Sequence, residues 1–82
     1  MRNLSNKIQR LGLLLEEQLD VRIIRYETTN DPLSFDVFLR FQMEDMITEN
    51  VFYFGVKLSI FNVDEAYDEV RVYINVKRKL EE

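Results

Sequence analysis

Hydrophobic residues take every second position in three stretches of this chain. These residues are Phe35, Val37, Leu39, Phe41 and Met43 in the first stretch, Phe52, Phe54, Val56, Leu58 and Ile60 in the second, and Val70, Val72, Ile74 and Val76 in the third. A period of two is that of a β-strand, because successive side chains on a strand point to opposite faces. The pattern therefore predicts strands at about 34–43, 51–61 and 70–78, each with one apolar face.

The N-terminal segment has a different period, which predicts an amphipathic helix at about 3–19. Its apolar stripe consists of Leu4, Ile8, Leu11, Leu15 and Leu19, at spacings of four, three, four and four. Asn3 is a suitable N-cap. Gly12 in mid-helix costs up to about 1 kcal/mol relative to alanine, which we attribute to close approach of the helix to the sheet. Leu13 falls on the polar side, either as a single exposed leucine or as a partner contact.

A further strand is predicted at about 21–28, although its alternation is broken. Val21 and Ile23 suit one face, whereas Ile24 and Tyr26 suit the other. A bulge near Ile23 and Ile24 reconciles them, and a two-sided strand is the alternative. The Thr29–Pro32 segment has the composition of a turn, and acidic connectors are expected at 44–50 and 62–69.

These elements predict a single α+β domain over 1–82. Short connections favour an up-and-down antiparallel order of strands, and one helix can cover one face of a sheet. We therefore expect an N-terminal amphipathic helix packed on one face of a four-stranded antiparallel β-meander. The core would join the helix stripe to the odd positions of 35–43 and the even positions of 52–60 and 70–76.

Composition removes several kinds of chemistry. The 82 residues include no cysteine and no histidine, and the formal net charge is −4. Disulfides are excluded, and the usual zinc ligands and the most common general base are missing. We expect a protein that is not an enzyme, with no cofactor, metal or small-molecule substrate. The apolar run at 11–15 is too short for a signal peptide or a membrane span, so we expect a cytoplasmic protein with no membrane partner.

The face of the sheet that the helix leaves uncovered is the main candidate for function. It would carry Asp36, Phe38, Arg40, Gln42, Tyr53, Gly55, Lys57, Ser59, Phe61, Arg71, Tyr73, Asn75 and Lys77. This set has four basic residues, one acid and four aromatic rings, although the whole chain is acidic. Placing Phe41 opposite Phe52 would pair Arg40 with Tyr53, Asp36 with Lys57 and Phe38 with Gly55. We prefer that register to one shifted by two residues, which we expect to lose all three pairs.

We interpret this surface as a protein-binding site, and the chain as a bacterial or phage accessory or inhibitor protein that binds another protein or itself. Tyrosine, phenylalanine and arginine are enriched at interfaces, and an edge strand could also extend a partner's sheet. The candidate binding residues are Phe38, Arg40, Tyr53, Lys57, Arg71 and Tyr73, with Leu13 as an outlier. Alternatively, the aromatic and basic side chains only pack across strands and keep the face solvated.

Two other functions remain open. The same face could bind single-stranded nucleic acid, with bases stacked on rings and cations along the phosphates; the net acidity ranks this second. Acidic side chains could instead imitate the phosphates of DNA and block a DNA-binding protein. Those acids are Glu16, Glu17, Asp20, Glu44, Asp45, Glu49, Asp64, Glu65, Asp68 and Glu69.

Overall fold

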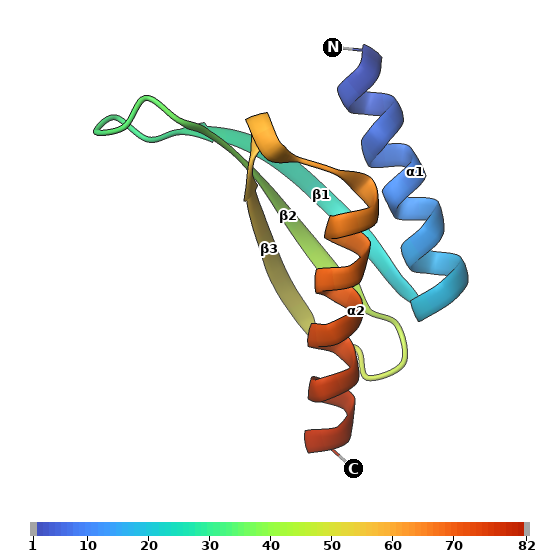
Figure 1. Cartoon of the computed structure of the whole chain (residues 1–82). Coiled ribbons are helices and arrows are strands. Elements are labelled where there is room, and N and C mark those ends of the chain that lie inside the picture. The colour runs from blue at the N-terminus through green and yellow to red at the C-terminus, as the bar shows by residue number, and fades with distance from the viewer. Residues whose placement is uncertain (1, 82) are drawn as a thin grey trace.

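A computed structural model describes residues 2–81 of the chain. The elements follow in the order α1 (Arg2–Leu19), β1 (Val21–Asn30), β2 (Val37–Asp45), β3 (Val51–Lys57), a short 3₁₀ helix (Leu58–Ile60) and α2 (Val63–Leu80). The fold is α+β, and its three strands form one antiparallel sheet in the order β1-β2-β3. The prediction of a four-stranded meander with one helix is wrong. The sheet has three strands, and one helix precedes it and another follows it in the chain (Figure 1).

The segment expected to be the fourth strand is the second half of α2. The buried residues of the whole α2 helix are Val63, Ala66, Val70 and Ile74, which follow helical spacings of three, four and four. The N-cap Asn62 accepts a hydrogen bond from the Glu65 N–H at 3.1 Å. Acids occupy the first turn and bases the last, which matches the helix dipole. These signals outweigh the period of two, and they leave Val72 and Val76 about half exposed.

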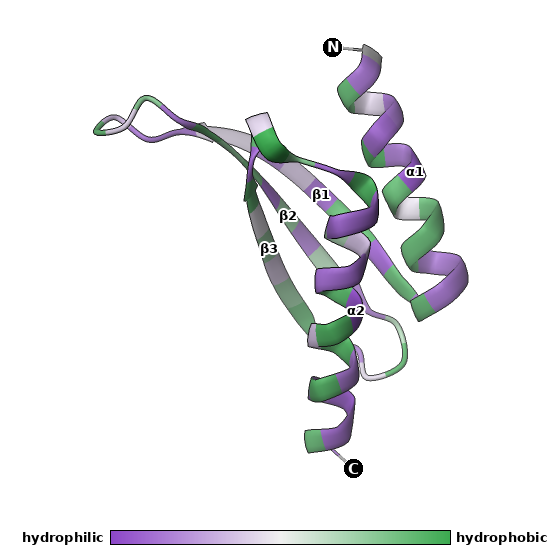
Figure 2. Ribbon diagram, in the orientation of Figure 1, coloured by the Kyte–Doolittle hydropathy of each residue, from purple (hydrophilic) through white to green (hydrophobic). Residues whose placement is uncertain are grey.

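Both helices cover the same face of the sheet. The core joins Leu11 and Leu15 of α1 and Val70 of α2 to Leu39 and Phe41 of β2. Hydrophobic and hydrophilic residues alternate along β2 in Figure 2, as expected for a strand with one covered and one open face. We call the uncovered side of the sheet the open face.

Several predicted core positions are wrong. Phe35 is 88% exposed, because β2 begins only at Val37 and Phe35 belongs to the loop before it. Phe61 was expected on the uncovered face but is buried against Phe41, because β3 ends at Lys57 and the chain turns back towards the core. Ile60 is exposed for the same reason.

The predicted register between the second and third strands is wrong by two residues. Phe41 lies opposite Phe54, Arg40 opposite Gly55, and Gln42 opposite Tyr53. The diagonal neighbours still meet: the Arg40 guanidinium lies 5.8 Å from the Tyr53 ring centre, and Lys57 Nζ lies 3.4 Å from Asp36 Oδ2. Two of the three favourable contacts therefore survive the shift, because long side chains reach diagonal partners on a sheet.

The predicted bulge in the first strand is present. The pairing of β1 with β2 shifts between Ile23 and Arg25, so Ile24 is the extra residue. Ile23 lies opposite Met43 on the covered side, whereas Arg25 lies opposite Gln42 on the open face. The bulge thus determines which side chains of β1 lie on the same face of the sheet as Gln42 and Arg40 of β2.

Asp45, at the end of β2, is the one buried charged residue among those described, at 2% exposed. Arg78 of α2 donates to both of its carboxylate oxygens, from Nε at 3.0 Å and from Nη2 at 2.9 Å. Burial raises the pKa of the Asp45 carboxyl, but the hydrogen bonds from Arg78 and from the Ile47 and Thr48 N–H groups outweigh it and hold the pKa below its ordinary value. The pair fixes the last turn of α2 against the sheet.

No helix within residues 2–81 has both the length and the hydrophobicity to cross a membrane.

Candidate interaction face

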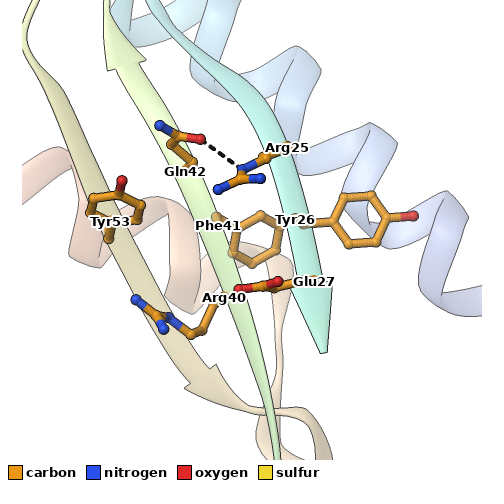
Figure 3. A pocket seen from close by; sticks show the side chains of 7 residues that line it. All are labelled: Arg25, Tyr26, Glu27, Arg40, Phe41, Gln42 and Tyr53. Atoms are coloured by element: carbon orange, nitrogen blue, oxygen red, sulfur yellow. Dashed lines mark hydrogen bonds between the residues drawn. The ribbon is translucent and has the colours of Figure 1, made fainter. Parts of the chain in front are cut away.

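The open face draws side chains from all three strands. The ladder places the following residues on it: Arg22, Arg25, Glu27 and Thr29 of β1, Phe38, Arg40, Gln42 and Glu44 of β2, and Val51, Tyr53, Gly55 and Lys57 of β3. Figure 3 looks onto the middle of this face, with both helices behind the sheet. Four of these residues are basic and two are acidic, so the face carries more positive charge than the chain as a whole.

The middle of the open face is a shallow hollow of about 200 Å³. Arg25 Nε donates to Gln42 Oε1 at 2.8 Å, and this bond fixes the guanidinium above the sheet (Figure 3). Arg40 lies over the ring of Tyr53, a cation–π contact worth about 0.5–1 kcal/mol at an exposed site. Glu27 also lines the hollow. Each guanidinium group is therefore held by a contact with a neighbouring strand, Arg25 with Gln42 and Arg40 with Tyr53.

Arg25 and Arg40 differ from the other two cations of the face. Arg22 is paired with Glu44 at 2.7 Å, and Lys57 is paired with Asp36 at 3.4 Å. Within residues 2–81, neither Arg25 nor Arg40 forms an ion pair. Most N–H donors of these two arginines thus make no hydrogen bond within the described residues.

The predicted site residues separate into three groups. Phe38, Arg40, Tyr53 and Lys57 lie on the open face, on β2 and β3. The expectation that Arg71 and Tyr73 share this face is wrong, because both belong to α2. Arg71 pairs with Asp68 at 3.6 Å, whereas the ring of Tyr73 lies 4.9 Å from that of Phe52 at the edge of the sheet. Leu13 is 53% exposed on α1, in the helical layer.

Arg22, Arg25 and Glu27 were missing from the predicted face. The signal that could have found them is the bulge itself. Arg22 lies before Ile24 and Arg25 directly after it, so one extra residue is needed to bring both to the same side. Without the bulge, strict alternation separates them.

The loop between β1 and β2 carries two apolar side chains that project into solvent. Leu33 is 92% exposed and Phe35 is 88% exposed, and this loop extends away from the body of the molecule (Figure 1). Asp31 organises the loop by accepting from the Leu33 N–H at 3.0 Å and the Ser34 hydroxyl at 2.8 Å. These hydrogen bonds, that of Leu33 first, lower the pKa of Asp31. Phe35 has a φ of 59°, an unfavourable conformation for a bulky residue.

The acids proposed to imitate DNA do not all face solvent. Asp45 is buried against Arg78, and Glu44 is engaged by Arg22. The acids of α2 are exposed along its first two turns, but Asp68 is paired with Arg71. The exposed array is therefore smaller than the sequence suggests.

Comparison of this chain with models of known protein families, with curated proteins and with solved structures finds no match.

Proposed function

We propose that this chain is a cytoplasmic protein-binding module that recognises an acidic segment of another protein through its open face. The observation that carries this proposal is that Arg25 and Arg40, which line one hollow with Tyr53, form no ion pair within the described residues, although Glu27 lies opposite Arg40 in the ladder. Arginine and tyrosine are, with tryptophan, enriched among the residues that contribute most binding energy at protein interfaces. A bacterial or phage origin, as an accessory or inhibitor protein, is part of this proposal and rests on its small size and acidic charge.

The chemistry of the hollow favours carboxylates over a continuous run of phosphates. An arginine can bind a carboxylate through two parallel hydrogen bonds, and the Tyr53 ring offers apolar contact beside it. Glu27, however, lines the same hollow, and Glu44 and Asp36 flank it on the face. A nucleic-acid backbone would meet these acids at several points, whereas a peptide with one or two carboxylates can avoid them. Single-stranded nucleic acid is therefore the second candidate.

The experiment compares capture of partners from a bacterial lysate by three immobilised chains. The wild type is compared with the double variant Arg25→Ala, Arg40→Ala and with a control, Arg10→Ala, Leu13→Ala, which removes a cation and an apolar side chain from the exposed surface of α1. We expect the wild type and the control to retain the same protein, and the Arg25→Ala, Arg40→Ala variant to lose it. Equal capture by all three chains would exclude the open face, and loss by the α1 variant alone would place the site on the surface of α1 that carries Arg10 and Leu13.

A second measurement separates protein from nucleic acid. The anisotropy of a fluorescent single-stranded oligonucleotide is followed as the protein is added at low salt, where phosphate contacts are strongest. The proposal predicts no change in anisotropy at concentrations that saturate the protein partner. Binding that weakens steeply with salt and is lost in Arg25→Ala, Arg40→Ala would replace the protein partner with nucleic acid.

A further inference from the structure

The outer edge of β3 is the less protected of the two sheet edges. In the described chain β3 pairs with β2 only, so its other side carries unpaired backbone groups. Between Val51 and Val56 it has no charged residue and no proline, and Tyr53 is 61% exposed. The edge strand β1 instead carries Arg22, Arg25 and Glu27, of the kind that discourages pairing. An exposed apolar edge without such charges is a template for another strand.

One side of α2 runs along this edge. Tyr73 packs on Phe52, as described above, and lines a hollow with Lys77 and Val51. One turn earlier, Glu69 lines a small cavity with Phe54 and Val56 of β3. Glu69, Tyr73 and Lys77 therefore follow one another at helical spacing of four, beside the free edge.

The same part of α2 exposes more apolar surface than a solvated helix needs. Val72 and Val76 are 53% and 52% exposed, Tyr73 is 42% exposed and Leu80 is 76% exposed. Hydrophobic bands are visible along the C-terminal half of α2 in Figure 2. Val76 and Leu80 neighbour Tyr73 and Lys77 on the helix surface, so this apolar surface adjoins the edge of the sheet.

The order of charges on this side of α2 is self-complementary. A second α2 placed antiparallel to the first, with the two Tyr73 side chains opposite each other, brings Glu69 of each copy opposite Lys77 of the other. The same two-fold axis can relate the two β3 strands. If they pair antiparallel about Tyr53, Phe52 of one copy lies opposite Phe54 of the other, on the side of the sheet that the helices cover. Because Tyr73 packs on Phe52, next to Tyr53 in the chain, one axis can serve both pairings.

We infer that the occupant of this edge is a second copy of the chain, in a symmetric dimer joined through β3 and α2. The two sheets become one six-stranded antiparallel sheet, with α2 of each copy packed against α2 of the other. An interface of this kind is isologous, since each surface is its own complement. It uses neither Arg25 nor Arg40, but it places Tyr53 of the open face at its axis, so the two proposals are separated by variants of the arginines and of α2 rather than of Tyr53.

Charge exchange at α2 tests this inference by sedimentation equilibrium over a range of protein concentrations. The wild type is expected to dimerise. Each single variant, Glu69→Lys or Lys77→Glu, is expected to raise the dimer dissociation constant by about tenfold or more, because it places two pairs of like charges opposite each other across the axis. The double variant Glu69→Lys, Lys77→Glu is expected to recover wild-type affinity, since it restores opposite charges across the axis. Glu17→Lys, an equal charge change on the exposed surface of α1, is the control and should dimerise like the wild type.

Three results would overturn the inference. They are a wild type that stays monomeric at the highest concentration, single variants that dimerise as well as the wild type, and a double variant that does not recover affinity. Far-ultraviolet circular dichroism of every variant verifies that the helices are intact. The Arg25→Ala, Arg40→Ala variant should dimerise normally, so failure of the open-face proposal and failure of the dimer are seen in different chains.

Discussion

Arg78 of α2 donates hydrogen bonds both to Asp45 of β2 and to Leu19 at the end of α1. While its Nε and Nη2 donate to the Asp45 carboxylate, Nη2 also donates to the Leu19 carbonyl oxygen at 2.6 Å. Leu19 is the last residue of α1, so one side chain connects both helices and the sheet. The contact also shows that the C-terminal ends of α1 and α2 lie together.

Replacing Arg78 with methionine should destabilise the protein strongly. The substitution keeps most of the apolar stem but leaves the Asp45 charge buried without its cationic partner, and breaking a buried pair from one side costs roughly 3–5 kcal/mol. We expect a loss of about 3 kcal/mol, near the lower end, because the Arg78 side chain keeps 23% of its exposure. Urea unfolding followed by circular dichroism measures it. Lys79→Met, at the exposed neighbouring position, should stay within about 0.5 kcal/mol; equal losses in both variants would contradict the role of the pair.

The same ion pair predicts a loss of stability in acid. The ordinary pKa of the Asp45 carboxyl is 3.8, and it is lower in the folded chain, so the unfolded state binds the proton more readily. The stabilisation is therefore complete above pH 3.8 and is lost as the pH falls through the folded pKa. The gap in unfolding free energy between wild type and Asp45→Asn should narrow from pH 6 to pH 3. Asp31, whose pKa is also lowered, is common to both chains and does not affect this difference. A constant gap would show that Asp45 is not stabilised as the carboxylate.

The failure to predict α2 has a specific cause. Val70, Val72, Ile74 and Val76 fit a strand, and β-branched residues favour strands; but Val63, Ala66, Val70 and Ile74 fit a helix over a longer stretch. The sequence also contained Asn62 three residues before Glu65, and acids before bases, which mark the two ends of a helix. The apolar stripe of α1 fits no other period. The predicted helix at about 3–19 therefore differs from the observed one only by one residue at its N-terminal end.

Substituting alanine for Gly12 should stabilise the protein. A Cβ at this position would lie 3.7 Å from Ile23 Cδ1, an ordinary van der Waals contact, so close approach to the sheet does not require glycine. Alanine is the better helix former by up to about 1 kcal/mol. Chemical denaturation should show a gain of that size with no change in the denaturant slope. A lower unfolding free energy would mean that the helix and sheet pack more tightly than the structure indicates.

Substituting glycine for Phe35 should also stabilise the chain, although it removes a large apolar side chain. Phe35 makes little contact with the body of the protein, and its left-handed backbone costs a non-glycine residue about 1–2 kcal/mol. We expect a gain of about 1 kcal/mol in thermal or urea unfolding. Leu33→Gly is the matched control, since Leu33 is equally exposed but does not share the positive φ. A gain in the control and none in Phe35→Gly would contradict the explanation.

About half of the candidate face could be predicted from sequence, and the residues from β1 depended on the position of the bulge. Alternation alone placed Arg40 and Tyr53 on one side of the sheet, because a shift of two residues preserves the face of every side chain. Favourable pairs could not choose the register, since the Arg40–Tyr53 contact forms diagonally as well as directly. Arg25 joined the face only through the bulge, which adds one residue to the count.

The most direct test of the central claim, that the open face binds a protein, is site-specific photo-crosslinking in bacterial cells that express the chain. A photoreactive phenylalanine analogue replaces either Phe38, on the open face, or Glu17, on the outer side of α1. We predict a covalent product with another protein from position 38 and none from position 17, and loss of that product when Arg25 and Arg40 are changed to alanine. Product from position 17 alone, or none from position 38, would contradict the account.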